Sequence, residues 1–120
     1  MLLKILFSLL LFFPLIKHDV KRVKEKDKVL IFSLTREYHH KNIPDGIRAI
    51  KKLGIENNFT ADATEDSSYF RDEVLKKYEA IIFINPTGSD FFTDKEKKAL
   101  QNYIQQDGGF VGICSYRLFI

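Results

Sequence analysis

Residues 80–85 read AIIFIN, five apolar residues followed by a polar stop at Asn85. The run is rich in β-branched residues, and the turn-forming residues Pro86 and Gly88 follow it. A short apolar run without polar alternation is typical of a strand that is covered on both faces, as in a parallel sheet. We therefore expect a buried strand at residues 80–85.

Three other segments have strand character. Residues 28–34 (KVLIFSL) form a second run of the buried kind. Residues 59–64 (FTADAT) alternate more weakly, which predicts a less buried strand near an edge of the sheet. Residues 110–114 (FVGIC) predict the last strand.

Helical patterns separate these strands. In residues 43–53, Pro44 suits a first helical turn, apolar residues recur at helical spacing, and Gly54 is expected to end the helix. Residues 66–78 predict a loop and a short helix. Thr93 stands three residues before Glu96, the spacing of a capping box, so a third helix is expected to begin there and run to about residue 106.

Strands joined by helical crossovers of this length pair in parallel, and the crossovers are right-handed. The sequence therefore predicts an α/β fold with a doubly wound parallel sheet of the flavodoxin kind and the strand order 2-1-3-4. In such sheets ligands bind at the carboxyl ends of the strands. This rule directs attention to residues 35–42, 64–68 and 85–90 and to the surroundings of Cys114.

Composition narrows the class of protein. With 120 residues, 45% hydrophobic and 29% charged, the chain is expected to fold and not to be intrinsically disordered. Its 19 basic and 16 acidic residues are interspersed, which argues against nucleic acid as a partner. The single cysteine, Cys114, excludes an internal disulfide and a four-thiolate zinc site.

The amino terminus has the character of an export signal. Residues 5–16 (ILFSLLLFFPLI) are uncharged and follow Lys4, but they fall short of the roughly 20 residues of a spanning helix. We expect a signal peptide or short anchor at residues 1–16, a linker at 17–27 and the domain at 28–120. The protein is then exported and meets a membrane only through this segment. No small-residue cleavage site follows Ile16, so cleavage is left open.

The carboxyl terminus predicts an incomplete sheet. The strand at residues 110–114 is apolar on both faces, yet residues 115–120 offer no covering helix or further strand. We expect the amino-terminal half of a larger domain, truncated by a lesion such as a frameshift and inactive as it stands.

The loops exclude some kinds of ligand. Residues 35–42 lack glycine, so neither a dinucleotide fingerprint nor a phosphate-binding loop is present there, and no cofactor is expected. His39 and His40 are adjacent, so their side chains diverge and no metal site is expected. They are either exposed loop residues or, for one of them, the donor of a hydrogen bond or proton to a ligand.

Each of the other loop residues has two possible roles, one in ligand binding or catalysis and one in the local structure. Asp66 offers a carboxylate to a ligand or caps a helix. Asn85 and Thr87 offer an amide and a hydroxyl, or serve only the turn. Cys114 lies at a strand end with Gly112 two residues before it, as a nucleophile would, but Tyr116 stands two residues after it and no histidine follows to act as base.

Four segments together resemble the ThuA-like (trehalose utilisation) family, whose fold is similar to that of class I glutamine amidotransferases. In order along the chain they are TREYHHKNIPDGIRAIKKLG (35–54), FTADATED (59–66), AIIFINPTG (80–88) and FTDKEKKALQNYIQQDGGFVGI (92–113). The resemblance extends from Lys28 to Ile113. Where the family continues into His-Ser-Ala and a long second half, this chain has Cys114, Ser115 and Tyr116.

The resemblance implies a role in the utilisation of a carbohydrate, of the trehalose type or a modified disaccharide. It implies that five residues bind this ligand: His40, Asp66, Asn85, Thr87 and Gly88. Two alternatives stay open. One is a cysteine-dependent enzyme of the amidotransferase or hydrolase kind using Cys114, and the other is a non-catalytic binding module whose open last strand pairs with another chain. The oligomeric state is not predicted.

Overall fold

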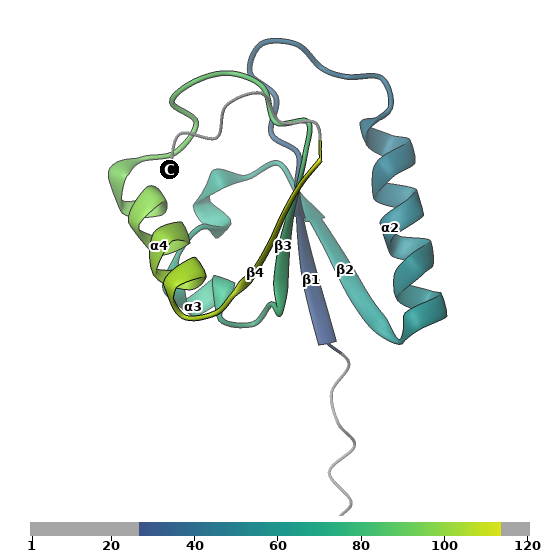
Figure 1. Cartoon of the computed structure of the whole chain (residues 1–120). Coiled ribbons are helices and arrows are strands. Elements are labelled where there is room, and N and C mark those ends of the chain that lie inside the picture. Colours follow the sequence, from purple (N-terminus) through teal and green to yellow (C-terminus); the bar gives the residue numbers. More distant parts are fainter. Residues whose placement is uncertain (1–26, 114–120) are drawn as a thin grey trace, which may run out of the picture.

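The computed structural model describes residues 27–113, which form a four-stranded, all-parallel sheet with the order β2-β1-β3-β4 (Figure 1). The predicted fold class and strand order are thus confirmed. The strands are β1 (Asp27–Phe32), β2 (Phe59–Thr64), β3 (Ala80–Ile84) and β4 (Gly109–Ile113).

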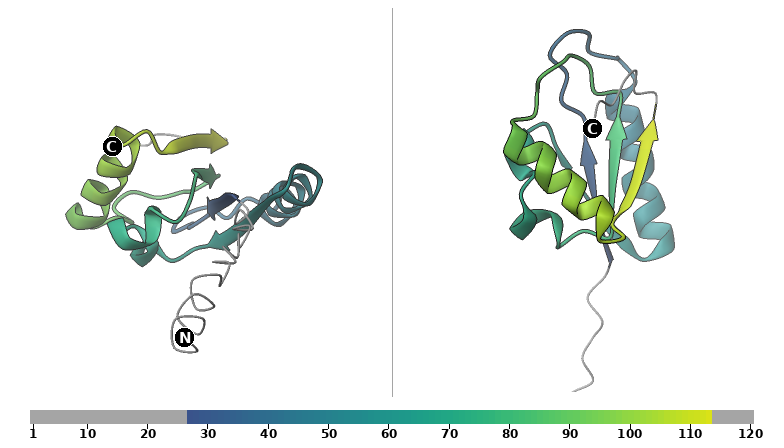
Figure 2. Two further views of the ribbon diagram at one scale, coloured as in Figure 1. Left: turned by 90° about the horizontal axis from the view of Figure 1, so that it is seen from below. Right: turned by 60° about the vertical axis from the view of Figure 1, so that its left-hand side comes forward.

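Helices cover both faces of the sheet. The helix α2 (Ile43–Asn57) packs on one face, and α3 (Asp72–Leu75) and α4 (Asp94–Gln105) pack on the other (Figure 2). A short 3-10 helix, η2 (Ser67–Tyr69), precedes α3. This is the doubly wound arrangement that alternating strands and helices predict.

The pleat of the buried strands divides their side chains between two cores. Leu30 and Phe32 belong to the larger core under α3 and α4, whereas Ile31 belongs to the smaller core under α2. Successive residues of a strand point to opposite faces, so the buried part of β1, Leu30 to Phe32, needs apolar side chains at successive positions. This explains why the run at residues 28–34 shows no polar alternation.

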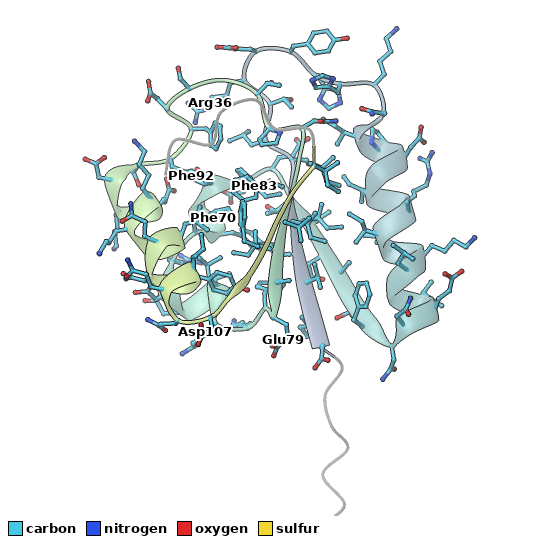
Figure 3. The ribbon with its side chains drawn as sticks, in the orientation of Figure 1. Arg36, Phe70, Glu79, Phe83, Phe92 and Asp107 are labelled. Carbon is cyan, nitrogen blue, oxygen red and sulfur yellow. The ribbon has the colours of Figure 1, made fainter. Side chains whose placement is uncertain are left out.

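The ring of Phe32 lies at the centre of an aromatic cluster. Figure 3 labels three members of this cluster, Phe70, Phe83 and Phe92. The centroid of the Phe32 ring is 4.8 Å from that of Phe70, 5.0 Å from Phe83, 5.4 Å from Phe92 and 5.9 Å from Phe91. Phe91 and Phe92 belong to the loop between β3 and α4. The aromatic cluster therefore attaches this loop to the sheet.

The capping box at the start of α4 is present as predicted. The hydroxyl of Thr93 accepts a hydrogen bond from the backbone N–H of Glu96 (3.3 Å), and the Glu96 carboxylate accepts one from the N–H of Thr93 (2.7 Å). Two amides that the helix itself leaves without acceptors are thereby satisfied.

The expected end of α2 was wrong. The helix continues through Gly54 to Asn57 and ends at Asn58, whose φ of 61° is left-handed and whose N–H binds the Gly54 carbonyl. Gly54 has a packing role instead, because a Cβ there would lie 2.6 Å from the carbonyl oxygen of Phe59. Glycine allows α2 to approach β2 closely, and an asparagine takes the left-handed position.

The strand ends differ from the expected ones by one or two residues. The first strand begins at Asp27 and ends at Phe32, and the last is Gly109–Ile113. Cys114 lies outside the described residues. In β4, Val111 is 48% and Ile113 is 40% exposed. Both pair with β3 residues, Ile82 and Ile84, that belong to the α2 side of the sheet. The α2 face of this edge strand is thus uncovered within residues 27–113.

Within residues 27–113, no helix combines the length and apolar character needed to cross a membrane. The apolar segment at residues 5–16, predicted to be a signal or anchor, lies outside the described residues.

The two glycines of α2 have different surroundings, so replacing each by alanine should change the free energy of unfolding in opposite directions. A Cβ at Gly46 would meet only Ile84 side-chain atoms, at 3.5 Å or more, which is ordinary van der Waals contact. Gly46→Ala should therefore raise the free energy of unfolding by about 0.5–1 kcal/mol through helix propensity. Gly54→Ala should lower it by about 1–3 kcal/mol, because backbone atoms of Phe59 must move.

Urea unfolding followed by circular dichroism measures both variants against the parent chain. A stabilising Gly54→Ala substitution would contradict the close approach of α2 to β2.

Candidate ligand-binding rim

Two loops lie side by side at the carboxyl edge of the sheet, one following β1 and one following β3 (Figure 1). We call residues 35–42 and 85–90 of these loops the rim. Thr35 and Thr87 form an isolated parallel bridge between them. Because β1 and β3 are parallel neighbours, both loops start at the same edge, which brings residues far apart in the sequence together.

Thr87 joins the two loops through three hydrogen bonds. Its N–H donates to the Leu34 carbonyl (3.3 Å), and its own carbonyl accepts from the N–H of Arg36 (2.9 Å). Its hydroxyl donates to the carbonyl of Tyr38 (2.7 Å). The hydroxyl therefore fixes the path of the first loop, and its oxygen still has a lone pair to offer a ligand.

Asn85 is a buried residue at the base of the rim. It is 3% exposed and has a φ of 43°, a left-handed conformation that asparagine tolerates better than most residues. Its side-chain amide donates to Oδ1 of Asn42 (3.2 Å), and its N–H donates to the Ile113 carbonyl (3.0 Å). Asn85 thus connects the end of β3 with the start of α2 and with β4.

Gly88 is required by two features of its surroundings. Its φ of 103° is unfavourable for any residue with a side chain, and a Cβ there would lie 3.0 Å from Cβ of Arg36. Glycine lets the two loops of the rim touch.

The histidines of the rim have different neighbours. Nδ1 of His39 lies 3.0 Å from the Thr35 hydroxyl, within hydrogen-bond distance. The half-buried ring of His40 packs against Tyr38, with centroids 4.8 Å apart and planes at 87°. The His40 carbonyl accepts a hydrogen bond from the N–H of Ile43 (3.2 Å) at the start of α2. His40 is therefore held by both its ring and its backbone.

Asp66 lies outside the two rim loops, in the segment that follows β2. Its carboxylate accepts a hydrogen bond from the N–H of Ser68 (2.9 Å) and caps η2, which is the helix-cap reading of this residue. Hydrogen bonds from the backbone and side chain of Ser68 lower the pKa of Asp66. The hydroxyl of Ser67 donates a hydrogen bond to the carboxylate of Glu96 (3.3 Å), so this segment contacts α4. Among residues 27–113, no hydrogen bond joins Asp66 to His40 or Thr87.

Sequence reasoning missed three residues that build the rim: Thr35, Tyr38 and Asn42. All three lie in the loop that the sheet topology had marked for attention. Their individual roles depend on contacts with Thr87, His39 and Asn85, and such contacts have no signature in sequence spacing. The residues that the structure describes contain no cluster of metal-binding side chains. Cys114, the alternative nucleophile, lies outside them.

A hollow of about 410 Å³ lies at the opposite edge of the sheet. Its lining includes Tyr78, Glu79, Tyr103 and Asp107, from segments that precede β3 and β4; Figure 3 shows Glu79 and Asp107 far from Arg36. Burial, with a hydrogen bond to Asp62, raises the pKa of Tyr78 to about 12. This hollow is at the amino ends of the strands and shares no residue with the rim.

Comparison with known proteins gives two matches. The family model ThuA, described as trehalose utilisation, matches residues 28–115, which include the whole rim and all four strands except Asp27. A crystal structure of a ThuA-like protein from Bacteroides uniformis is similar, with a TM-score of 0.59 and 30% sequence identity. The match covers 72% of this chain and 35% of that chain, so the present chain spans about a third of that protein. No curated protein matches this chain.

The hydroxyl bond of Thr87 gives a prediction for the rim. Thr87→Val keeps the shape of the side chain but leaves the Tyr38 carbonyl without its donor, so the free energy of unfolding should fall by about 1 kcal/mol. Backbone amides of residues 38–41 should also exchange faster with deuterium. Thr87→Ser, which keeps the hydroxyl, should restore most of the protection. Equal behaviour of the valine and serine variants in urea unfolding and amide exchange would contradict this role.

Proposed function

The chain belongs to the ThuA (trehalose utilisation) family, and from this premise we propose that its rim binds a carbohydrate of the trehalose type or a modified disaccharide. The observation that carries the proposal is the set of three hydrogen bonds made by Thr87. They hold the loop with His40 and the loop with Gly88 as one preformed surface. A preformed polar surface pays little ordering entropy when a polyhydroxylated ligand binds.

In this proposal the five residues predicted to bind the ligand have different roles. His40 and Thr87 meet the sugar, because Thr87 joins the two loops and the His40 ring packs on Tyr38, whose carbonyl accepts the Thr87 hydrogen bond. Asn85, which is buried, and Gly88, which has no side chain, shape the surface. Asp66 stands at the α4 side and reaches the same ligand only if the sugar extends across the ends of β1 and β2.

Conversion of the sugar is a separate matter from its binding. The chain spans 35% of the length of the similar solved protein, so an activity of the whole protein would also use residues beyond those described. Inactivity of this chain alone stays a prediction. The alternative reaction at Cys114 also stays a prediction, as does a purely binding role. A sugar that binds without being converted would favour the binding role.

We also propose that the protein is exported. The proposal is supported by the uncharged segment at residues 5–16 and the basic residue before it. When the full chain is expressed in a bacterium, it should be found outside the cytoplasm, and deletion of residues 2–16 should retain it inside. Fractionation followed by intact-mass measurement checks both location and cleavage. The full-length chain free in the cytoplasm would contradict export.

Sugar binding is tested by titration calorimetry with trehalose. His40→Ala should weaken binding about fivefold, because a hydrogen bond to the ligand worth about 1 kcal/mol is lost. Lys51→Ala, on the exposed side of α2 and away from the rim, is the control and should bind like the parent chain. Unchanged affinity of the His40 variant would count against the assignment of this residue.

A further inference from the structure

Tyr38 is a large aromatic residue in an exposed loop of the rim. Its side chain is 61% exposed, although it stands among the polar groups of the rim. The hydroxyls of the two buried or half-buried tyrosines are bonded within the protein, Tyr78 to Asp62 (2.9 Å) and Tyr103 to the Tyr78 carbonyl (3.0 Å). Among residues 27–113, the Tyr38 hydroxyl makes no such bond. Neither burial of the ring nor a hydrogen bond of its hydroxyl therefore explains why a tyrosine occupies position 38.

The Tyr38 ring is nevertheless held in place. Thr87 donates to the carbonyl of Tyr38 (2.7 Å), which fixes the backbone. The His40 ring packs at 87° to the Tyr38 ring with centroids 4.8 Å apart, an edge-to-face geometry that aromatic pairs favour. A rigid aromatic ring with only two side-chain torsions loses little entropy when a ligand covers it.

Pyranose rings match such a surface. One face of a pyranose presents C–H groups, while its hydroxyls lie around the perimeter. A flat aromatic ring buries the C–H face, and neighbouring polar groups bind the perimeter. His39 and the Thr35 hydroxyl, 3.0 Å apart, adjoin Tyr38 in the same loop and are groups of this kind.

We propose that Tyr38 is the stacking platform on which one pyranose ring of the sugar lies, and that it selects cyclic sugars over open-chain polyols. The inference rests on the proposed function, because it concerns the same rim. It adds the residue that determines ligand class and the part of the ligand that is recognised.

The test uses the full chain with trehalose and with sorbitol, which carries hydroxyls but has no ring face. Binding is measured by calorimetry, and saturation-transfer NMR identifies the ligand protons that touch the protein. Tyr38→Phe should bind trehalose within about twofold of the parent chain, because the ring remains. Tyr38→Ala should bind at least about tenfold more weakly, and the saturation of the pyranose C–H protons should disappear.

Ile55→Ala is the control for loss of an exposed apolar side chain, since Ile55 is 83% exposed near the far end of α2. It should bind trehalose like the parent chain. Circular dichroism verifies that each variant is folded, and the exposure of Tyr38 makes folding of its variants the expected result.

The possible failures are distinguishable. If the parent chain binds trehalose and Tyr38→Ala binds equally well, the platform is overturned while the proposed function stands. Loss of binding in Tyr38→Phe as large as in Tyr38→Ala would assign the effect to the hydroxyl and overturn stacking. Equal affinity for sorbitol and trehalose would also overturn it. No binding of trehalose to the parent chain overturns the proposed function and the platform together.

Discussion

The packing of the Phe32 ring is the contact on which the rest of the structure depends. Phe32 is fully buried at the end of β1 and touches Phe83 of β3, Phe70 beside α3, and Phe92 in the loop before α4. One side chain thus connects the sheet, the helical layer and the loop that carries the rim. Burying an aromatic ring of this size contributes several kcal/mol, a large part of the stability of a small domain.

The rim obtains its order from this apolar layer beneath it. Phe91 and Phe92 attach the β3–α4 loop to Phe32 of the sheet, while the hydrogen bonds of Thr87 hold it to the β1–α2 loop. Polar loops on a protein surface lack a core of their own, so their rigidity comes from what they are attached to. The preformed surface that we propose for sugar binding is therefore a consequence of aromatic packing on one side and backbone hydrogen bonds on the other.

The proposed ligand surface combines two kinds of residue that the fold brings together. The hydroxyl of Thr87 comes from the end of β3, and Tyr38 with its two histidine neighbours comes from the loop after β1. The hydrogen bond between Thr87 and the Tyr38 carbonyl joins both contributions. The hollow at the opposite edge is lined by tyrosines whose hydroxyls are already bonded, and it takes no part in this arrangement.

The sequence by itself determined the four strands, their parallel order, the capped start of α4 and the edge where the rim lies. Each of these follows from local signals: apolar runs, helical spacing, and Thr93 three residues before Glu96. Only the tertiary structure decided that Gly54 is a packing contact within α2, which of its two expected roles Asp66 takes, and that Tyr38 is supported by Thr87 and His40. The Tyr38–Thr87 bond joins residues 49 positions apart, and no local pattern encodes such a contact. The contacts of Gly54, Asp66 and His40 are closer in sequence, but each depends on how the chain folds back after a helix, a strand or a loop.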